Sequence, residues 1–375
     1  MKICILSTLH PPSDPRIFRK EAQSLGKKYP ILLIAPSNKS EEVKSGKISL
    51  SLVKKPGRNI LHFITFYRIF RVAMRNDYDV IHCHEPDSLL MGLLLKKIKG
   101  CKLVYDVHEH WPTELPFDLG LKPRSVLFKM AGMLVSGLEM LCARRADRII
   151  VVSESVAERF LENELDPVII ANFPLEWDQE LPSTREKPKN LVYVAGNMHF
   201  FHGINRCVAA LDILSEHYPG ISLTLIGKLR ETLADVIPQT GLRERIRCTG
   251  FLAPEEMYGE LRHGGIGLLL FQPSYYNIFI GLPNKLFDYM LCGLPVIASN
   301  FPEIQKIVND AKCGILVDPE NVDEIASAVR SLLDHPDDAE RMGKNGQKAV
   351  REKYNWGEME KRLFSLYKEL GEEIK

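Results

Sequence analysis

Short apolar runs rich in Ile, Val and Leu alternate along the chain with longer segments whose apolar residues recur about every 3.6 positions. The short runs are nearly continuous, as in strands of a parallel sheet covered on both faces, and the longer segments are typical of amphipathic helices. In the first half, the predicted strands are 3–7, 31–35, 49–53, 80–82, 102–106, 148–153 and 168–171. The predicted helices between them are 16–28, 88–99, 121–146 and 154–163.

The alternation stops between residues 172 and 190, where prolines interrupt a polar stretch that predicts a linker. It then resumes with predicted strands at 191–195, 221–226, 246–249, 266–271, 295–299 and 315–317. This order predicts two doubly wound α/β domains in tandem. Because ligands bind at the carboxyl ends of the strands in such sheets, the main site is expected in a cleft between two facing domains.

The segment 281–299 carries the most specific chemical signal. Pro283 marks a loop, a helix is expected from about Asn284 to Cys292, and Asn284 is a good N-cap candidate. A helix N-terminus suits a phosphate, and Lys285 adds a full positive charge there. One turn later, Asp288 is able to accept two hydroxyl hydrogen bonds, as a ribose diol offers. Taken alone, the segment is equally compatible with a capped surface helix.

The same segment, with its P-x-K-x-x-D-Y-M sequence from Pro283 to Met290, resembles the donor-binding segment of family 4 glycosyltransferases of the GT-B fold. The resemblance covers nearly the whole chain and includes the segment 300–319 and the residues 354–356. It implies two Rossmann-like doubly wound α/β domains facing across a cleft. The expected organisation is an acceptor-side domain at 1–172, a linker at 173–190, a donor domain at 191–354, and a helix at 355–375 that crosses back to the N-terminal domain.

The loop at 194–203 is similar to the family's first strand and loop of the donor domain. The family usually has an Arg and a Lys there to hold the donor diphosphate, whereas this chain has Asn197 and His202. Lys285 and Lys228 are therefore the available cations, and His202 adds charge if it is protonated. The first of the family's paired glutamates is also missing. The expected donor-binding residues are Gly196, Asn197, His202, Lys228, Phe251, Pro283, Asn284, Lys285 and Asp288.

Two features mark the N-terminal domain as the acceptor side. In the first loop, Asp14 is expected to cap the helix that starts at Pro15, and Arg16 to meet an acceptor phosphate. In the segment 104–110, His108 resembles the family's strand-end histidine that faces the donor sugar, with Glu109 beside it. The histidine pairs at 82/84 and 108/110 invite a metal interpretation, but no helix or cysteine supports it, so no metal is expected.

The resemblance implies transfer with retention of configuration, without metal or other cofactor. The leaving diphosphate takes the acceptor's proton, and the protein contributes positioning and charge stabilisation. His108, Lys285 and Asp288 are the expected catalytic residues. The implied substrates are a nucleotide diphosphate-sugar, with a hexose-type sugar, and a glycan or lipid-linked acceptor of cell-surface polysaccharide or glycolipid synthesis. The alternatives are an inactive homologue that acts as a partner subunit and a nucleotide-sugar epimerase.

Charge and composition add the expected location. The net charge of +1 argues against a nucleic-acid-coating protein. The residues 1–172 carry 26 basic and 19 acidic side chains, a net charge of +7, and the remainder carries −6. The basic, aromatic helix expected around 63–75 and the apolar segment 121–148 are compatible with an anionic membrane surface or with a solvated basic edge. Without a signal peptide or an uninterrupted apolar span, the protein is expected in the cytoplasm, with peripheral contact to the membrane.

Overall fold

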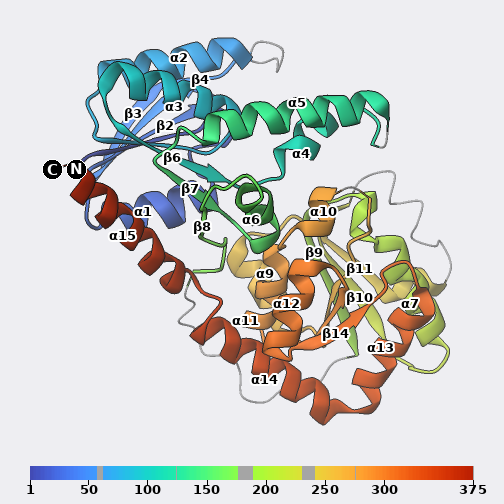
Figure 1. Cartoon of the computed structure of the whole chain (residues 1–375). Coiled ribbons are helices and arrows are strands. Elements are labelled where there is room, and N and C mark those ends of the chain that lie inside the picture. The colour runs from blue at the N-terminus through green and yellow to red at the C-terminus, as the bar shows by residue number, and fades with distance from the viewer. Residues whose placement is uncertain (57–61, 124, 176–188, 230–240, 275, 375) are drawn as a thin grey trace. The chain divides into compact units, whose positions relative to one another are not determined.

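The computed structural model describes residues 1–56, 62–123, 125–175, 189–229, 241–274 and 276–374 (Figure 1). Most of the predicted linker, residues 176–188, lies outside the described residues. By its internal contacts the chain divides into two units. Unit 1 comprises Met1–Asn172 and Trp356–Lys375, and unit 2 comprises Phe173–Asn355. The C-terminal helix is thus part of unit 1.

Unit 1 is built on a sheet in the order β3-β4-β2-β1-β5-β6-β7-β8. All its neighbouring strands are parallel except the antiparallel pair β3 and β4. The strands are β1 (Ile3–Leu6), β2 (Ile31–Ser37), β3 (Glu41–Ser45), β4 (Ile48–Lys54), β5 (Val80–Cys83), β6 (Lys102–Val107), β7 (Arg148–Val151) and β8 (Val168–Ile169). The central strands are buried along their length, as their continuous apolar runs predicted.

The helices of unit 1 are η1 (Pro15–Ala22), α1 (Gln23–Gly26), α2 (His62–Arg75), α3 (Pro86–Lys99), α4 (Trp111–Asp118), α5 (Val126–Ala143), α6 (Glu154–Leu161) and α15 (Trp356–Glu373). Helix α15 packs against η1, and the Trp356 indole N–H donates to Ser24 Oγ of α1 at 2.9 Å. Further along α15, the Tyr367 hydroxyl lies 2.7 Å from Nδ1 of the buried His82. The C-terminal helix thus reaches the core of unit 1 beneath the sheet edge that carries the candidate site.

Unit 2 has a fully parallel sheet in the order β11-β10-β9-β12-β13-β14. Its strands are β9 (Asn190–Met198), β10 (Ser222–Leu229), β11 (Ile246–Gly250), β12 (Ile266–Leu269), β13 (Val296–Ser299) and β14 (Gly314–Val317). Its helices are η3 (Phe200–His202), α7 (Ile204–Ser215), η4 (Gly241–Arg245), α9 (Pro254–Arg262), α10 (Tyr276–Ile280), α11 (Asn284–Leu291), α12 (Pro302–Ala311), α13 (Val322–Asp334) and α14 (Pro336–Glu352).

Both sheets reverse their strand order at one point, between β1 and β5 in unit 1 and between β9 and β12 in unit 2. At such a switch point the loops leave the two strands in opposite directions and open a crevice at their carboxyl ends. Unit 1 places Ser7–Asp14 and His84 there, and unit 2 places His202 and Phe271 there. Both crevices therefore coincide with segments that the sequence singled out.

In unit 1, two of the described elements were not predicted from the pattern. All the side chains of β3 are exposed, so this edge strand has no apolar run to reveal it. Helix α4 has prolines at positions 112 and 116, which argue against a helix in a sequence. In addition, the segment predicted as one helix at 16–28 is a π-helical turn, η1, that continues into α1. π-helical turns are often found at functional sites.

Candidate functional site

The candidate site of unit 2 is built around the start of α11. The helix begins at Asn284 and ends at Leu291, close to the predicted bounds. However, the N-cap is Pro283, with no side-chain cap, and Asn284 is exposed in the first turn. The prediction that Asn284 caps the helix is therefore wrong. The first-turn N–H groups have no side-chain acceptor, which is the condition for an anion-binding helix terminus.

Lys285 is buried rather than solvated. Its side chain is 9% exposed, and its Nζ donates to Tyr193 Oη at 3.3 Å. The ammonium group lies 4.4 Å from the ring centre of Tyr193 and 4.8 Å from that of Phe271. Within the described ranges, no carboxylate forms an ion pair with it. Burial lowers the pKa of Lys285 to about 7, because the surrounding rings stabilise the charge less than water does.

His202 belongs to the same aromatic group. Its ring lies 5.4 Å from that of Phe271 and 6.1 Å from that of Tyr193, and its Nδ1 accepts from the His199 backbone N–H at 2.8 Å. Burial, followed by the nearby charge of Lys285, lowers the pKa of His202 to about 3. The prediction that His202 adds a positive charge is therefore wrong. The neutral ring carries its proton on Nε2 and provides a hydrogen-bond donor instead.

Gly203 joins this group to helix α7. Its φ angle is +68°, and a Cβ at this position would lie 2.2 Å from the carbonyl oxygen of Leu270. Only glycine fits, because the end of the β9 connection touches the end of β12 here. Gly203 is also the N-cap of α7, with no side-chain cap. A second helix N-terminus therefore opens beside His202 at the switch point.

Asp288 is held one turn after Lys285. Its Oδ1 accepts a hydrogen bond of 2.7 Å from the Tyr258 hydroxyl, and the side chain is half-buried. The next residue, Tyr289, is fully buried. Its hydroxyl accepts from Val194 N–H and donates to Leu268 O, each at 2.9 Å. Tyr289 thereby ties α11 to both strands of the switch point, which fixes the positions of Lys285 and Asp288.

The remaining predicted donor residues lie on the surface of unit 2. Gly196 and Asn197 are exposed near the end of β9, and Asn197 is paired in register with the exposed Lys228 of β10. Phe251, just after β11, is 77% exposed. A bare phenyl ring of this kind is available for stacking on a planar ligand. The structure therefore brings together Lys285 and His202 and places Lys228 and Asn197 side by side.

In unit 1, His108 lies in a buried network of charges that Arg16 organises. The Arg16 guanidinium donates from Nη2 to both oxygens of Asp106, each at 2.9 Å, and from Nη1 to Ile170 O at 2.9 Å. Its Nε donates to His108 Nε2 at 3.0 Å. Since Arg16 is only 4% exposed and directs its donors into the protein, it positions Asp106 and His108. The predicted contact of Arg16 with an acceptor phosphate does not fit this geometry.

The pKa values of this network follow from burial and from Arg16. Burial raises the pKa of the Asp106 carboxyl, but the Arg16 charge, together with the interactions of His108 and His82, outweighs burial and holds this pKa well below its usual range. The pKa of His108 is lowered, first by burial and then by Arg16. His108 is therefore neutral at pH 7, with Nε2 as the hydrogen-bond acceptor. Burial, followed by repulsion from Asp106, raises the pKa of Glu21, which lies 3.0 Å from Arg16 Nε.

Glu21, His82, His84 and Asp106 each direct one ligand-type atom to a common point, with those atoms within 4.8 Å of one another. All four side chains are fully buried. The set has the donor types of a transition-metal site. Arg16 lies within ion-pair distance of both carboxylates, whereas His82 Nε2, His84 Nε2 and both Glu21 oxygens are buried without a hydrogen-bond partner among the described residues. The expectation that the protein holds no metal therefore stays a prediction.

The first loop of unit 1 is held by a buried carboxylate that the sequence did not single out. Glu85 accepts from the Ser7 hydroxyl and from the backbone N–H groups of Thr8 and Leu9. His10 follows in the loop, 3.4 Å from Asp14 and 3.9 Å from Glu85. Burial lowers the pKa of His10, but these carboxylates and Glu109 outweigh it and raise the pKa above its usual value.

Asp14 acts as predicted, as the N-cap of η1. It accepts from the backbone N–H groups of Arg16 and Ile17 at 2.9 and 3.0 Å. Burial alone would raise its pKa, but the bonds from His10 and Ile17 lower it to about 2. Glu109 is half-buried next to His108. Asp14, His10, His108 and Glu109 therefore lie together at the switch point of unit 1.

Two family models cover most of the chain. The model described as Glycosyltransferase Family 4 matches residues 19–173, and the model described as Glycosyl transferases group 1 matches residues 177–349. The division between them coincides with the boundary between unit 1 and unit 2. The chain belongs to the glycosyltransferases. Its two Rossmann-like units have the GT-B fold of that group.

Curated relatives of this glycosyltransferase align along most of its length. An uncharacterised glycosyltransferase of Methanocaldococcus jannaschii is 24% identical over 333 residues, which are 82% of this chain and 81% of the relative. The MMP alpha-(1->4)-mannosyltransferase of Mycolicibacterium hassiacum is 25% identical over 308 residues, 78% of this chain and 71% of the relative.

Solved structures show the same fold across the whole chain. Sucrose-phosphate synthase from Thermosynechococcus elongatus superimposes with a TM-score of 0.75 at 19% identity and covers 98% of each chain. HepE of Anabaena, solved in complex with UDP-glucose, gives a TM-score of 0.70 at 16% identity and covers 98% of this chain and 100% of its own.

Several side chains of the glycosyltransferase's candidate sites were missed by sequence reasoning. Tyr193 and Phe271 lie within or next to apolar strands, where an aromatic residue is most simply a core residue. Glu21 was hidden in a helical pattern, and Tyr367 is far away in the sequence at the C-terminus. A signal did exist for Glu85, because it sits directly after a strand and before Pro86.

Proposed function

We propose that this glycosyltransferase moves a sugar from a nucleotide diphosphate-sugar to a glycan or lipid-linked acceptor, with retention of configuration and without a metal ion. The donor is held by unit 2 and the acceptor by unit 1. The observation that carries the proposal is Lys285, a buried cation with aromatic neighbours and no carboxylate partner among the described residues. A buried charge without a counter-charge is costly unless an anionic ligand completes the site.

The donor diphosphate meets Lys285, the Nε2–H of His202 and the open N-termini of α11 and α7. Each of these groups favours negative charge, and each becomes more favourable as the leaving diphosphate gains charge in the transition state. Asp288 accepts from the ribose hydroxyls while Tyr258 holds it in place. The UDP-glucose complex of HepE, a protein of the same fold, supports a nucleotide-sugar as the donor class.

In unit 1, neutral His108 contacts the sugar and acceptor hydroxyls, and the leaving diphosphate takes the acceptor's proton. Arg16 holds the orientation of the His108 ring through its hydrogen bond to Nε2, and Asp106 holds Arg16 in place. Because Lys285 and the helix termini provide the positive charges, the proposed reaction needs no divalent cation. None of the eight cysteines, all of which lie in the described residues, forms a disulfide, in agreement with the proposed location in the reducing cytoplasm.

The test measures nucleotide binding and turnover separately. Thermal shifts with UDP, GDP, ADP and other nucleoside diphosphates identify the base, because a ligand stabilises the folded site by mass action. Lys285→Met should abolish most of the shift, whereas Lys348→Met, on the exposed side of α14, should leave it unchanged. Cleavage of the matching nucleotide-sugar should persist in chelator. A shift without any cleavage would favour the partner-subunit alternative, and activity restored only by a metal would contradict the metal-free reaction.

A further inference from the structure

Helices α5 and α3 of unit 1 expose a large set of apolar side chains. On α5, seven such side chains are between 52% and 72% exposed, and on α3 three are between 47% and 55% exposed. Figure 1 shows these two helices, which pack against each other and together carry this apolar set. We call it the apolar surface; it consists of Leu90, Leu94, Ile98, Val126, Leu127, Met130, Met133, Leu134, Leu138 and Leu141. Soluble monomers rarely leave contiguous apolar surfaces of this size without a partner.

The opposite face of α5 is anchored in the protein. Phe128 and Met140 are buried, and a Cβ on Gly132 would lie 2.6 Å from the carbonyl oxygen of Pro112 in α4. The one acidic residue of the helix, Glu139, is turned inward and pairs with Arg159 and with the Tyr105 hydroxyl. These contacts hold α5 along the side of unit 1.

By length and composition α5 is also sufficient to cross a membrane, although the sequence predicted no such span. Only 22% of this 18-residue stretch is buried within the protein. Because its polar contacts and its closest packing are all on one side, α5 is suited to lie in the plane of a bilayer surface. A spanning helix would instead need an apolar surface on every side.

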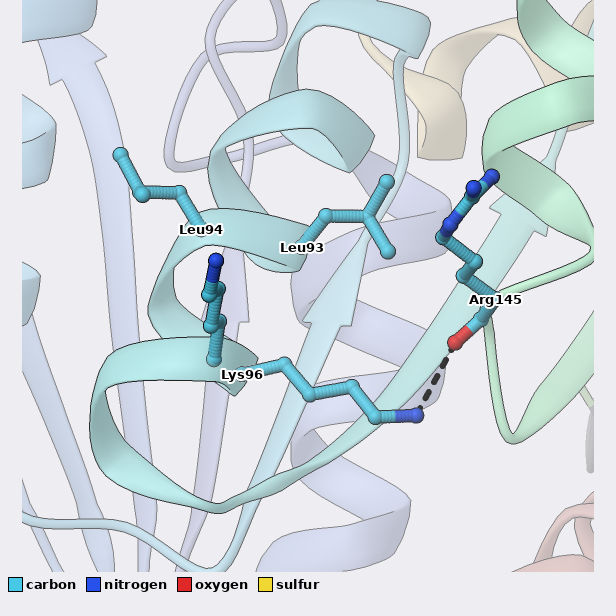
Figure 2. Close-up of a pocket in the computed structure, with 5 residues that line it drawn as sticks. Leu93, Leu94, Lys96 and Arg145 are labelled. Atoms are coloured by element: carbon cyan, nitrogen blue, oxygen red, sulfur yellow. Dashed lines mark hydrogen bonds between the residues drawn. The ribbon is translucent and has the colours of Figure 1, made fainter.

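Positive charges flank the apolar surface. Lys97 follows Leu94 on the exposed side of α3, and Arg144 and Arg145 are exposed where α5 ends. None of the three pairs with a carboxylate among the described residues. Between α3 and this end of α5 lies an open groove of about 700 Å³, lined by Leu93, Leu94, Lys96, Lys97 and Arg145. Figure 2 shows the two leucines beside Lys96, whose Nζ donates to Arg145 O at 2.9 Å.

We propose that unit 1 docks on an anionic phospholipid bilayer through this surface. The apolar side chains of α5 and α3 enter the boundary between headgroups and acyl chains, and Lys97, Arg144 and Arg145 meet the lipid phosphates. Apolar side chains bordered by unpaired cations match the two layers of such a bilayer. The sequence offered two segments for this contact: the basic, aromatic α2, which packs beside α3 and exposes Phe63 and Tyr67, and the segment 121–148, which contains α5. The structure shows that α5 and α3 supply the larger apolar area.

Vesicle co-sedimentation with the full chain tests the proposal. The wild-type protein should bind phosphatidylglycerol-containing vesicles. Its affinity for vesicles of pure phosphatidylcholine should be lower by about tenfold or more. The triple variant Leu134→Ser, Leu138→Ser, Leu141→Ser should lose binding to both. Lys97→Gln, Arg144→Gln, Arg145→Gln should lose only the preference for the anionic vesicles. Val43→Ser with Leu175→Ser, two exposed apolar residues elsewhere, should bind like the wild type.

The melting temperature without ligand, measured on every variant, confirms folding, and the nucleotide thermal shift separates this proposal from the proposed function. Lys285→Met should lose the nucleotide shift and still bind vesicles. Absence of wild-type vesicle binding at low salt would overturn the docking proposal, as would a serine variant that binds normally. A concentration-dependent dimer that the serine variant dissociates, without any vesicle binding, would assign the surface to a second copy of the chain instead.

Discussion

The two units bury positive charge in opposite ways. In unit 1, the Arg16 guanidinium is surrounded by Asp106, Glu21 and His108, and its donors are directed to protein acceptors. In unit 2, the Lys285 ammonium has aromatic rings around it and no carboxylate in an ion pair with it among the described residues. Arginine stays charged at any accessible pH, whereas a buried lysine titrates. The comparison indicates that the charge-balanced network of unit 1 positions the neutral His108. In unit 2, Lys285 lacks an ion-pair partner among the described residues and is suited to bind an anion.

The largest expected effect follows from unbalancing unit 1. Asp106→Asn removes the carboxylate that accepts two hydrogen bonds from Arg16 Nη2 and leaves Glu21 as the remaining carboxylate beside the buried guanidinium. The free energy of unfolding should fall by about 3–5 kcal/mol, as for other buried pairs that lose one member. Urea denaturation measures it. Glu260→Gln, which breaks the more exposed pair with Arg247, should cost only about 0–1 kcal/mol. If both variants lost the same free energy of unfolding, the buried Arg16–Asp106 pair would contribute no more than the exposed Arg247–Glu260 pair, which would contradict the prediction.

The second prediction removes the unbalanced cation. Lys285→Met should leave the free energy of unfolding unchanged or raise it, because no carboxylate loses its partner. The affinity for a nucleoside diphosphate should fall about tenfold or more, since a hydrogen bond to a charged group contributes about 1.5–3 kcal/mol. Isothermal titration calorimetry with the nucleotide identified by thermal shift measures this. Normal affinity in the variant would remove Lys285 from the site.

The third prediction uses the titration of Lys285. Its pKa is lowered to about 7 in the folded protein, so above pH 7 the unfolded chain binds more protons than the folded one. The stability of the ligand-free protein should therefore rise with pH above 7. Affinity for the diphosphate should fall over the same range, by up to about tenfold per pH unit, because the anion selects the protonated lysine. Both trends should vanish in Lys285→Met. If stability still rises and affinity still falls with pH in this variant, the titrating group is not Lys285.

The smallest effect concerns the support of the unit 1 network by the C-terminal helix. Tyr367→Phe removes the hydrogen bond to His82 and should cost about 0.5–1.5 kcal/mol of stability. The melting temperature and the hydrogen-exchange rates along α15 measure this. Tyr29→Phe is the matched control, because Tyr29 packs near the Tyr367 ring and its hydroxyl has no hydrogen bond to the described residues. A control that loses as much stability would show that only the packing of the rings matters.

Much of the fold was readable from the sequence because parallel strands are buried on both faces. Their apolar runs are therefore continuous, and every predicted strand is present. The strand β3 was not predicted because its side chains are all exposed, so it has no apolar run. At the candidate sites, the sequence singled out Lys285, Asp288 and Asp14 because a proline marks the start of the helix that each of them caps or belongs to.

What the sequence alone determined is the order of the elements, the division near residue 172 and the residue types at the carboxyl ends of the strands. The protonation states and partners were decided only by the tertiary structure. Arg16 meets Asp106 across 90 positions of sequence, and Lys285 meets Tyr193 across 92. Both contacts exclude water from a cation. Arg16 has a carboxylate beside it as a counter-charge, whereas Lys285 has no carboxylate in an ion pair with it among the described residues. Desolvation depends on every neighbour in space, so local sequence identified the charged side chains but not their charge state or role.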